Sequence, residues 1–225
     1  VGIIIGTITL TGAALTFGQF IVSVGRDSLF LSLVLTMLTC IVLGMGIPTI
    51  PNYIITSSIA GPALLELGVP LIVSHMFVFY FGILADLTPP VALACFAASP
   101  IAKESGLKIS FEAVKVAAAG FVIPFMAVYT PVLMLQPGGP LAESIGFIPA
   151  VIYITLKVIV AIGLWGAAVI GWLGVRLTVW ERALAMVAAF TLVAALPITD
   201  EIGFALGAMF AVLIWRRNRA KGVAA

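Results

Sequence analysis

Gly44-Met45-Gly46-Ile47-Pro48-Thr49-Ile50-Pro51 is a stretch rich in glycine and proline between two strongly apolar runs, 29–43 and 52–67. Glycine permits positive φ, and proline lacks an N–H and clashes with the preceding helical turn. The stretch therefore predicts a break between two helices. At membrane depth, irregular backbone persists only where protein or a water-filled cavity surrounds it, so the break is a candidate binding site.

The composition is that of an integral membrane protein. Of 225 residues, 63% are hydrophobic and 9% are charged, and the mean hydropathy is +1.28. A soluble domain carries roughly a quarter charged residues. Several apolar runs reach the ~20 residues that a transmembrane helix needs, so we predict an all-α polytopic membrane protein. The net charge of +2 does not indicate a nucleic-acid partner.

The two runs around the glycine-proline stretch are short for membrane spans. Each predicted helix has about fifteen residues, and at 1.5 Å per residue it covers roughly 22–24 Å, less than the ~30 Å hydrocarbon core. Two interpretations are open: a re-entrant hairpin over 29–67 with its tip inside the membrane, or two helices that cross separately. We favour the hairpin because its tip carries no charged residue.

A second interrupted element follows the first. The sequence predicts a helix over 71–84, a break at Ala85-Asp86-Leu87-Thr88-Pro89-Pro90, and a second helical piece over 91–98. The double proline is incompatible with regular helical hydrogen bonding. Neither piece spans a bilayer alone, but together they do. We therefore predict a discontinuous transmembrane helix over 71–98.

Outside these elements the sequence predicts three full spans and two shorter apolar segments. The spans cover 2–24, 111–135 and 149–173, and the shorter segments cover 183–196 and 202–215. We expect a tight polar turn at 25–28, a hydrophilic loop at 99–110, and a solvated turn that holds Asp200 and Glu201. Lys157 is the one charge in its span, and we expect it to reach an interface or to pair within the bundle.

Positive charges predict the orientation in the membrane. The chain ends with a basic segment, 216–221, which the positive-inside rule places in the cytoplasm. The same rule places 99–110 and 174–182 inside, and the Lys- and Arg-free segment 136–148 outside. This order holds if the hairpin 29–67 enters and leaves by the outer face, which supports a re-entrant hairpin independently of its glycines.

The two breaks together offer a set of oxygen atoms for a small cation. Unwound carbonyls and helix C-termini coordinate cations, and helix N-termini attract anions. For Na⁺ we predict the ligands Gly44, Gly46, Thr49, Asp86, Leu87 and Thr88. For the substrate we predict contacts from Thr49, Asn52 and Thr88, whose neutral donors suit a small carboxylate.

Simpler interpretations remain open for several of these residues. Gly44 and Gly46 would also suit a plain turn between crossing helices. Asp86 would also suit a cap of the helix after Pro90, and Asn52 a cap of the second hairpin arm. Outside the breaks, His75 suits a structural role better than a proton relay, and Cys40 and Cys95 suit small buried hydrophobic positions.

Two other functions compete with a carrier. One is an intramembrane aspartyl protease that uses Asp86 and Asp200, although neither residue lies in a GxGD-like setting. The other is a non-transporting membrane scaffold, in which the breaks would be packing kinks. Continuous helices through 44–51 and 85–90 would favour the scaffold.

Several stretches resemble the large membrane (permease) subunit of TRAP transporters. They are Gly44-Met45-Gly46-Ile47-Pro48-Thr49, His75-Met76-Phe77-Val78-Phe79-Tyr80-Phe81-Gly82, Thr88-Pro89-Pro90-Val91-Ala92-Leu93-Ala94, Ala119-Gly120-Phe121-Val122-Ile123-Pro124-Phe125 and Tyr129-Thr130-Pro131. The resemblance covers roughly residues 1–135. More narrowly, the chain is similar to the TAXI-type proteins, in which the small and large membrane subunits are fused. The tail, including Glu181-Arg182 and Thr199-Asp200-Glu201-Ile202-Gly203, resembles the extra C-terminal helices of that form less specifically.

The resemblance implies a secondary transporter and not an enzyme. Such a transporter takes up small organic anions, carboxylates among them, on a Na⁺ gradient, and a periplasmic TAXI-type binding protein delivers the substrate. It also implies a location in the cytoplasmic (inner) membrane of a bacterium or archaeon. Together with the charge pattern, this places the C-terminus in the cytoplasm.

In this family the large subunit is an elevator carrier with two inverted repeats, each with one hairpin and one broken helix. On that pattern, residues 1–136 are the C-terminal repeat of the transporter core. Residues 137–225 are additional transmembrane helices and a basic cytoplasmic tail. Because the chain begins at Val1 inside a hydrophobic run, we expect a C-terminal fragment. The missing N-terminal part of the same polypeptide would then complete the site within the lipid bilayer.

Overall fold

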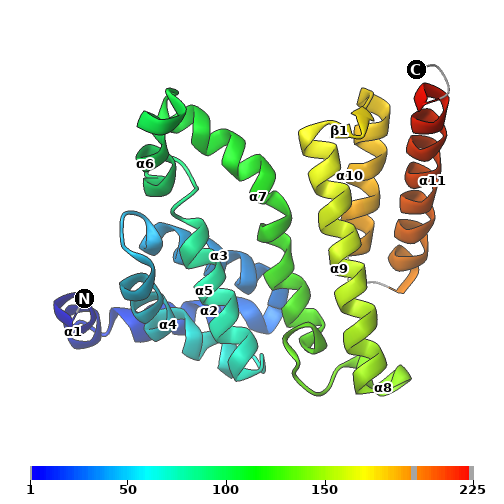
Figure 1. Cartoon of the computed structure of the whole chain (residues 1–225). Helices are drawn as coiled ribbons and strands as arrows, with labels where there is room; N and C mark the ends of the chain where they lie inside the picture. Colours follow the sequence, from blue (N-terminus) through cyan, green and yellow to red (C-terminus); the bar gives the residue numbers. More distant parts are fainter. Residues whose placement is uncertain (1, 194–196, 223–225) are drawn as a thin grey trace. The chain divides into compact units, whose positions relative to one another are not determined.

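The computed structural model describes residues 2–193 and 197–222, and within them all regular secondary structure is helical except for two strands of two residues each (Figure 1). The chain divides into two compact units, 1–115 and 116–225. Each unit has its own core and is described by itself.

The first unit is built on four helices that pack on one another. Its elements are α1 (Gly2–Leu10), α2 (Ala13–Asp27), α3 (Leu29–Gly44), α4 (Thr49–Glu66), α5 (Leu71–Leu84), α6 (Leu93–Ala102) and the start of α7 (Gly106–Tyr129). α3 and α4 pack on each other, and both α2 and α5 pack on this pair. Large side chains such as Leu33, Ile55 and Phe77 are fully buried between these helices.

Two predictions for the start of the chain are wrong. The single span 2–24 is two helices, because Gly12 adopts a left-handed conformation (φ 69°) between α1 and α2. Only glycine adopts this backbone without strain. The polar turn at 25–28 is also wrong, because α2 continues to Asp27. Ser28 alone is extended, and its hydroxyl caps α3 by accepting a hydrogen bond from the N–H of Leu31 (3.4 Å).

The predicted hydrophilic loop 99–110 is wrong for most of its length. α6 continues to Ala102 and α7 begins at Gly106, so only residues 103–105 lie between the two helices. The polar side chains stabilise the start of α7 instead of a loop. Ser105 accepts from the N–H of Lys108 (3.3 Å), and Lys108 donates to Glu104 (2.7 Å).

The second unit has three long helices. Its elements are the rest of α7, a 3₁₀ turn (Pro131–Met134), α8 (Pro140–Ile145), α9 (Phe147–Ile170), β1 (Trp172–Leu173), β2 (Val175–Arg176), α10 (Val179–Val193) and α11 (Pro197–Gly222). α10 packs against both α9 and α11, and the three lie side by side in Figure 1. Small residues on α9 and α10 (Ala168, Ala185, Ala188) are buried with Leu192 and Phe210, which permits close packing.

The structure also differs from the predictions in the second unit. The predicted spans 111–135 and 149–173 are α7, which ends at Tyr129, and α9, which ends at Ile170. The solvated turn around Asp200 and Glu201 is wrong, because α11 begins at Pro197 and both acids lie in it. Proline suits a first helical position, since its missing N–H would have no helical partner. The end of the predicted segment 183–196, residues 194–196, lies outside the described residues.

Among the described residues, two helices are long and apolar enough to cross a membrane, α7 and α9, with 24 residues each. α3, α5 and α6 are apolar but shorter. Many large apolar side chains are exposed on the described surface, among them Ile148, Ile159 and Val187. An exposed apolar surface of this kind is expected where lipid takes the place of water.

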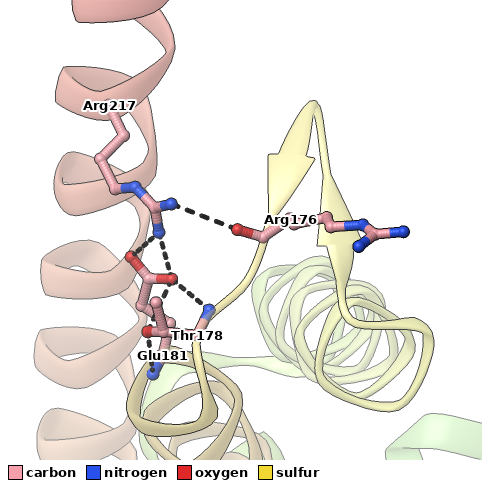
Figure 2. A network of polar contacts seen from close by, with 4 residues as sticks. All are labelled: Arg176, Thr178, Glu181 and Arg217. Atoms are coloured by element: carbon pink, nitrogen blue, oxygen red, sulfur yellow. Dashed lines mark hydrogen bonds and ion pairs between the residues drawn. The ribbon is translucent and has the colours of Figure 1, made fainter.

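A polar network joins the ends of α10 and α11 (Figure 2). Glu181 accepts from the N–H of Thr178 (2.7 Å), and Thr178 Oγ1 in turn accepts from the N–H of Glu181 (3.4 Å). This is a capping box, which satisfies two N–H groups at the start of α10. Arg217 of α11 donates to both carboxylate oxygens of Glu181 and to the carbonyl oxygen of Arg176.

Arg182 closes the end of the neighbouring helix. Its guanidinium donates to the carbonyl oxygens of Ala168 (2.7 Å) and Val169 (3.0 Å) in the last turn of α9. Carbonyls in the last turn have no partner within the helix, and the negative end of the helix dipole attracts a cation. The start of α10 is therefore tied both to the end of α9 and to α11.

The contact of α10 with α11 at Gly203 yields a test of the packing. A Cβ at Gly203 would lie 2.7 Å from Cγ and 2.9 Å from the backbone N of Leu192, too close for either to remain in place. We expect Gly203→Ala to destabilise the protein by about 1–3 kcal/mol, measured as thermal unfolding in detergent. Gly163→Ala in α9 is the control, since its Cβ would meet nothing within 4 Å. Equal stability of the two variants would contradict this packing.

The Glu181 network, which lies outside α7 and α9, yields a test of pH dependence. Burial alone would raise the pKa of the Glu181 carboxyl, but the hydrogen bonds from Arg217 and Thr178 together hold that pKa below its ordinary value of 4.5. A lowered pKa in the folded state stabilises the fold at a pH above the ordinary value, and this stabilisation is lost as pH falls through the lowered one.

We therefore expect the unfolding temperature to fall between pH 6 and pH 3.5, and to fall less in Glu181→Gln than in the unchanged protein. Thermal unfolding followed by tryptophan fluorescence measures this. The control is Glu201→Gln, which alters an exposed carboxylate in α11. An identical pH profile in Glu181→Gln and the unchanged protein would show that the network does not couple to folding.

Candidate functional site

The first helix break is shorter than the sequence predicts. α3 ends at Gly44, residues 45–48 are non-helical, and α4 begins at Thr49. Gly46 has φ 78°, and the N–H of Ile47 donates to the carbonyl oxygen of Gly44 (3.4 Å). Pro51 lies inside the first turn of α4, where N–H groups have no helical partner, so it does not extend the break.

The second break is longer than predicted. α5 ends at Leu84, residues 85–92 are non-helical, and α6 begins at Leu93, two residues later than expected. Ala92 adopts a left-handed conformation (φ 38°), which ends the break. Both helices are therefore interrupted. Continuous helices at these two places would have favoured a non-transporting scaffold.

The two breaks lie against each other. A Cβ at Gly44 would be 2.8 Å from the carbonyl oxygen of Gly82 and 2.9 Å from Cβ of Ala85. Farther along, a Cβ at Gly46 would be 3.7 Å from Cγ1 of Val91. The lack of a side chain at Gly44 is what permits this approach, so the end of α3 meets the end of α5 directly.

Asn52 lies at the centre of this contact. It is 1% exposed, and its Nδ2 donates to the carbonyl oxygen of Gly82 (2.6 Å). It is the fourth residue of α4 and does not cap that helix, so the capping interpretation is wrong. Its Oδ1 is buried and accepts no hydrogen bond from the described residues. A buried acceptor without a donor is costly, and it suggests a missing partner.

Asp86 carries a second such atom. Its Oδ1 is buried and has no partner among the described residues, and its carboxylate does not cap α6. Its backbone carbonyl accepts from the N–H of Ala94 (3.2 Å), which ties the second break to the first turn of α6. The two breaks therefore contribute one orphaned oxygen from an amide and one from a carboxylate.

The other predicted residues differ in their surroundings. The carbonyl oxygen of Leu87 accepts from the hydroxyl of Ser110 (2.6 Å), and Thr88 Oγ1 donates to the carbonyl oxygen of Leu84 (2.8 Å). Both residues are half-buried. Gly46 and Thr49 are exposed at the rim, where the side chain of Thr49 has no partner in the structure as described.

Two residues at the site are absent from the sequence-based prediction. Gly82 supplies the carbonyl that holds Asn52, and Ser110, which is fully buried, holds the carbonyl of Leu87. A glycine near the end of an aromatic helix was a usable signal for Gly82. Ser110 gave none, because it stands in a polar stretch that the sequence indicates as a loop.

His75 has a structural environment. Its Nδ1 is 2.9 Å from the hydroxyl of Tyr53, and Tyr53 packs edge-on against Phe79. This contact links α4 to α5. Cys40 and Cys95 are buried, as predicted.

The comparison with protein families bears on this site. Residues 1–140 match the family described as "Tripartite ATP-independent periplasmic transporter, DctM component". The chain belongs to this family. The match includes both helix breaks and every predicted site residue. Neither the curated proteins nor the solved structures gave a match.

Membership in this family gives the chain its general role. The family is the large, non-enzymatic component of TRAP-type membrane transporters, a multi-pass protein of the inner membrane. The family implies association with a periplasmic binding protein and a small membrane subunit. The two long apolar helices of the chain fit this location.

The second unit continues beyond the family match. It contains Asp200, the residue that an aspartyl protease would use together with Asp86. Asp200 accepts from Lys157 and from the hydroxyl of Tyr153 (2.7 Å). Of the two roles expected for Lys157, reaching an interface or pairing within the bundle, the structure shows the pairing. Asp200 therefore forms an ion pair and lies in α11, whereas the sequence predicted a solvated turn at this position.

The close approach at Gly44 can be tested in this chain. In Gly44→Ala, the new Cβ would lie 2.6 Å from Nδ2 of Asn52, so the amide must leave Gly82. We expect a loss of about 2–4 kcal/mol in stability and faster hydrogen exchange at residues 82–88, measured by mass spectrometry. The control is Gly61→Ala, whose Cβ would meet the His75 ring at 4.0 Å, an ordinary contact. Unchanged exchange in Gly44→Ala would contradict the described contact.

Proposed function

We propose that this chain is the membrane permease component of a Na⁺-coupled, binding-protein-dependent transporter that takes up small organic anions. The observation that carries the proposal is the meeting of two helix breaks at Asn52. Oδ1 of Asn52, at this contact, and Oδ1 of Asp86, in the second break, are each buried without a donor among the described residues. Backbone without helical bonding is tolerated at membrane depth where it lines a binding site.

The residues present fit a hard monovalent cation. Orphaned amide and carboxylate oxygens need a positive partner, and a cation supplies that charge when bound. The proposed Na⁺ ligands are the carbonyls of Gly44, Gly46 and Leu87 together with oxygens of Thr49, Asp86 and Thr88. Of these, Asp86 has the strongest support, because its free oxygen is buried. Oδ1 of Asn52 is a further acceptor for the cation, although the sequence analysis predicts Asn52 as a substrate contact.

An anionic substrate suits the neighbouring surface. Thr49 is exposed at the start of α4, and Thr88 is half-buried at the second break. Threonine hydroxyls and the free N–H groups of a helix N-terminus can donate to a carboxylate. We propose that Thr49, Asn52 and Thr88 contact the substrate, with the bound cation offsetting its negative charge.

The short helices around the first break support a re-entrant hairpin. α3 has 16 residues and α4 has 18, which at 1.5 Å per residue is roughly 24 and 27 Å, less than the ~30 Å of a hydrocarbon core. We propose that this hairpin and the broken helix α5–α6 form one repeat of an elevator carrier, within the proposed core of residues 1–136. The rest of the polypeptide supplies the second repeat, a TAXI-type protein delivers the substrate, and the C-terminus is cytoplasmic.

Uptake by the complete transporter in proteoliposomes with its binding protein tests this function. We expect uptake under an imposed Na⁺ gradient and none under a pH gradient alone. Asp86→Asn removes the charge but keeps the shape, and we expect it to raise the Na⁺ concentration for half-maximal uptake about tenfold, the equivalent of about 1.4 kcal/mol.

Two results would contradict the proposal. One is uptake driven by a pH gradient without Na⁺. The other is an Asp86→Asn variant with the Na⁺ dependence of the unchanged protein. Glu112→Gln serves as the matched control, because Glu112 is an exposed carboxylate in α7 that pairs with Lys115. Its Na⁺ dependence should stay unchanged.

A further inference from the structure

A buried ion pair lies in the second unit, beyond the part of the chain that matches the DctM family. Lys157 is ten residues from the start of α9, about 15 Å along a helix that is long enough to span the membrane. Its side chain is 5% exposed, and its Nζ donates to Oδ1 of Asp200. Tyr153 donates to the other carboxylate oxygen, Oδ2, at 2.7 Å.

Stability alone is a weak reason for this pair. Burying a lysine and an aspartate costs desolvation energy that their attraction repays only in part, and apolar residues would join α9 to α11 as well. Ionisable side chains at membrane depth are costly and commonly mark a path or a binding site. The pair therefore calls for a role besides packing.

A cavity of about 410 Å³ lies beside the pair, wholly within the second unit. Lys157, Asp200 and Tyr153 line it, as do Tyr129, Thr130 and Ser144, which carry hydroxyl groups. Val132, Leu141 and Ile154 give it an apolar wall. A site of this size, mostly apolar with a few converging polar groups, is typical of small-molecule binding.

The hydrogen-bond inventory of the pair is incomplete. The lysine ammonium has three donors, and a carboxylate accepts at about four positions. Within the described residues, Lys157 uses one donor, and Asp200 accepts one bond from Lys157 and one from Tyr153. Two N–H donors of the Lys157 ammonium, whose side chain is 5% exposed, therefore have no acceptor among the described residues, and that side chain lines the cavity.

We propose that this cavity binds a small zwitterion with one carboxylate and one ammonium group, as in a free α-amino acid. The carboxylate accepts from the unused donors of Lys157, and the ammonium donates to the unused positions of Asp200. The ion pair need not separate. The apolar wall contacts the side chain of the ligand, and the hydroxyl groups complete the hydrogen bonding.

Charge balance selects this class of ligand. Lys157 and Asp200 together carry no net charge. A simple anion would add an uncompensated negative charge beside the buried pair, and a simple cation would add a positive one. A zwitterion places each of its charges beside the opposite one and leaves the total at zero.

The test is equilibrium binding to the purified 225-residue chain in a maltoside detergent, since a zwitterionic detergent could occupy the site. The probes are glycine, L-leucine and L-glutamine. Two analogues of leucine complete the set: 4-methylpentanoate, which lacks the ammonium, and 3-methylbutylamine, which lacks the carboxylate. We expect saturable calorimetric binding of at least one amino acid, and at least tenfold weaker binding of both leucine analogues than of leucine.

Variants locate the binding. The double variant Lys157→Met with Asp200→Asn leaves no unpaired buried charge, and we expect it to abolish binding. Ser144→Phe fills the cavity from α8 without touching the pair, and it should also abolish binding while the unfolding temperature stays within a degree. Lys108→Met removes an exposed charge in α7 and should bind as the unchanged protein does.

Three results would overturn the proposal. They are no saturable binding of any of the three amino acids, binding of 4-methylpentanoate as tight as that of leucine, and binding that survives Ser144→Phe. Binding of 4-methylpentanoate alone would assign the cavity to simple anions. None of these outcomes depends on Na⁺-driven transport, so the proposed function stands or falls separately.

Discussion

The first unit depends on one hydrogen bond that two glycines make possible. The amide of Asn52 reaches the carbonyl oxygen of Gly82 at 2.6 Å because neither Gly44 nor Gly82 has a side chain in its way. This bond joins α4 to the end of α5 at the level where α3 ends. Both helix breaks lie beside this bond, where three helix ends converge. The same bond leaves Oδ1 of Asn52 without a partner, so one amide both holds the fold together and presents an acceptor to the site.

Much of this arrangement could be predicted from the sequence, because the signals are local. Glycine and proline act on the backbone at their own position. The bounds of α3 and α5 were therefore predicted to within one residue, and the ends of both breaks to within three. Residues of the site that act through tertiary contact were harder. The buried Ser110 supports Leu87 from 23 positions away, and no local pattern reveals such a partner.

The incorrect predictions share a physical cause. Polar residues were taken as markers of turns, but at Ser28 and Ser105 they cap helices, and at Asp200 the acid lies within a helix, paired with a lysine. Polarity indicates where hydrogen bonds are needed and does not decide which backbone conformation provides them. The break at Gly12 was missed for the opposite reason. A single glycine in an apolar run is often tolerated in a helix, and only its left-handed φ distinguishes it.

The attachment of α11 has a mechanical consequence. Near its first turn Asp200 is held by Lys157 of α9, and near its last turn Arg217 is held by Glu181 of α10. These two anchors are seventeen residues apart, about 25 Å along the helix axis. A slide by one turn or a rotation about the axis would break both ion pairs at once. The ion pairs therefore fix the three long helices of this unit against sliding, and in any large movement they move together as one rigid body.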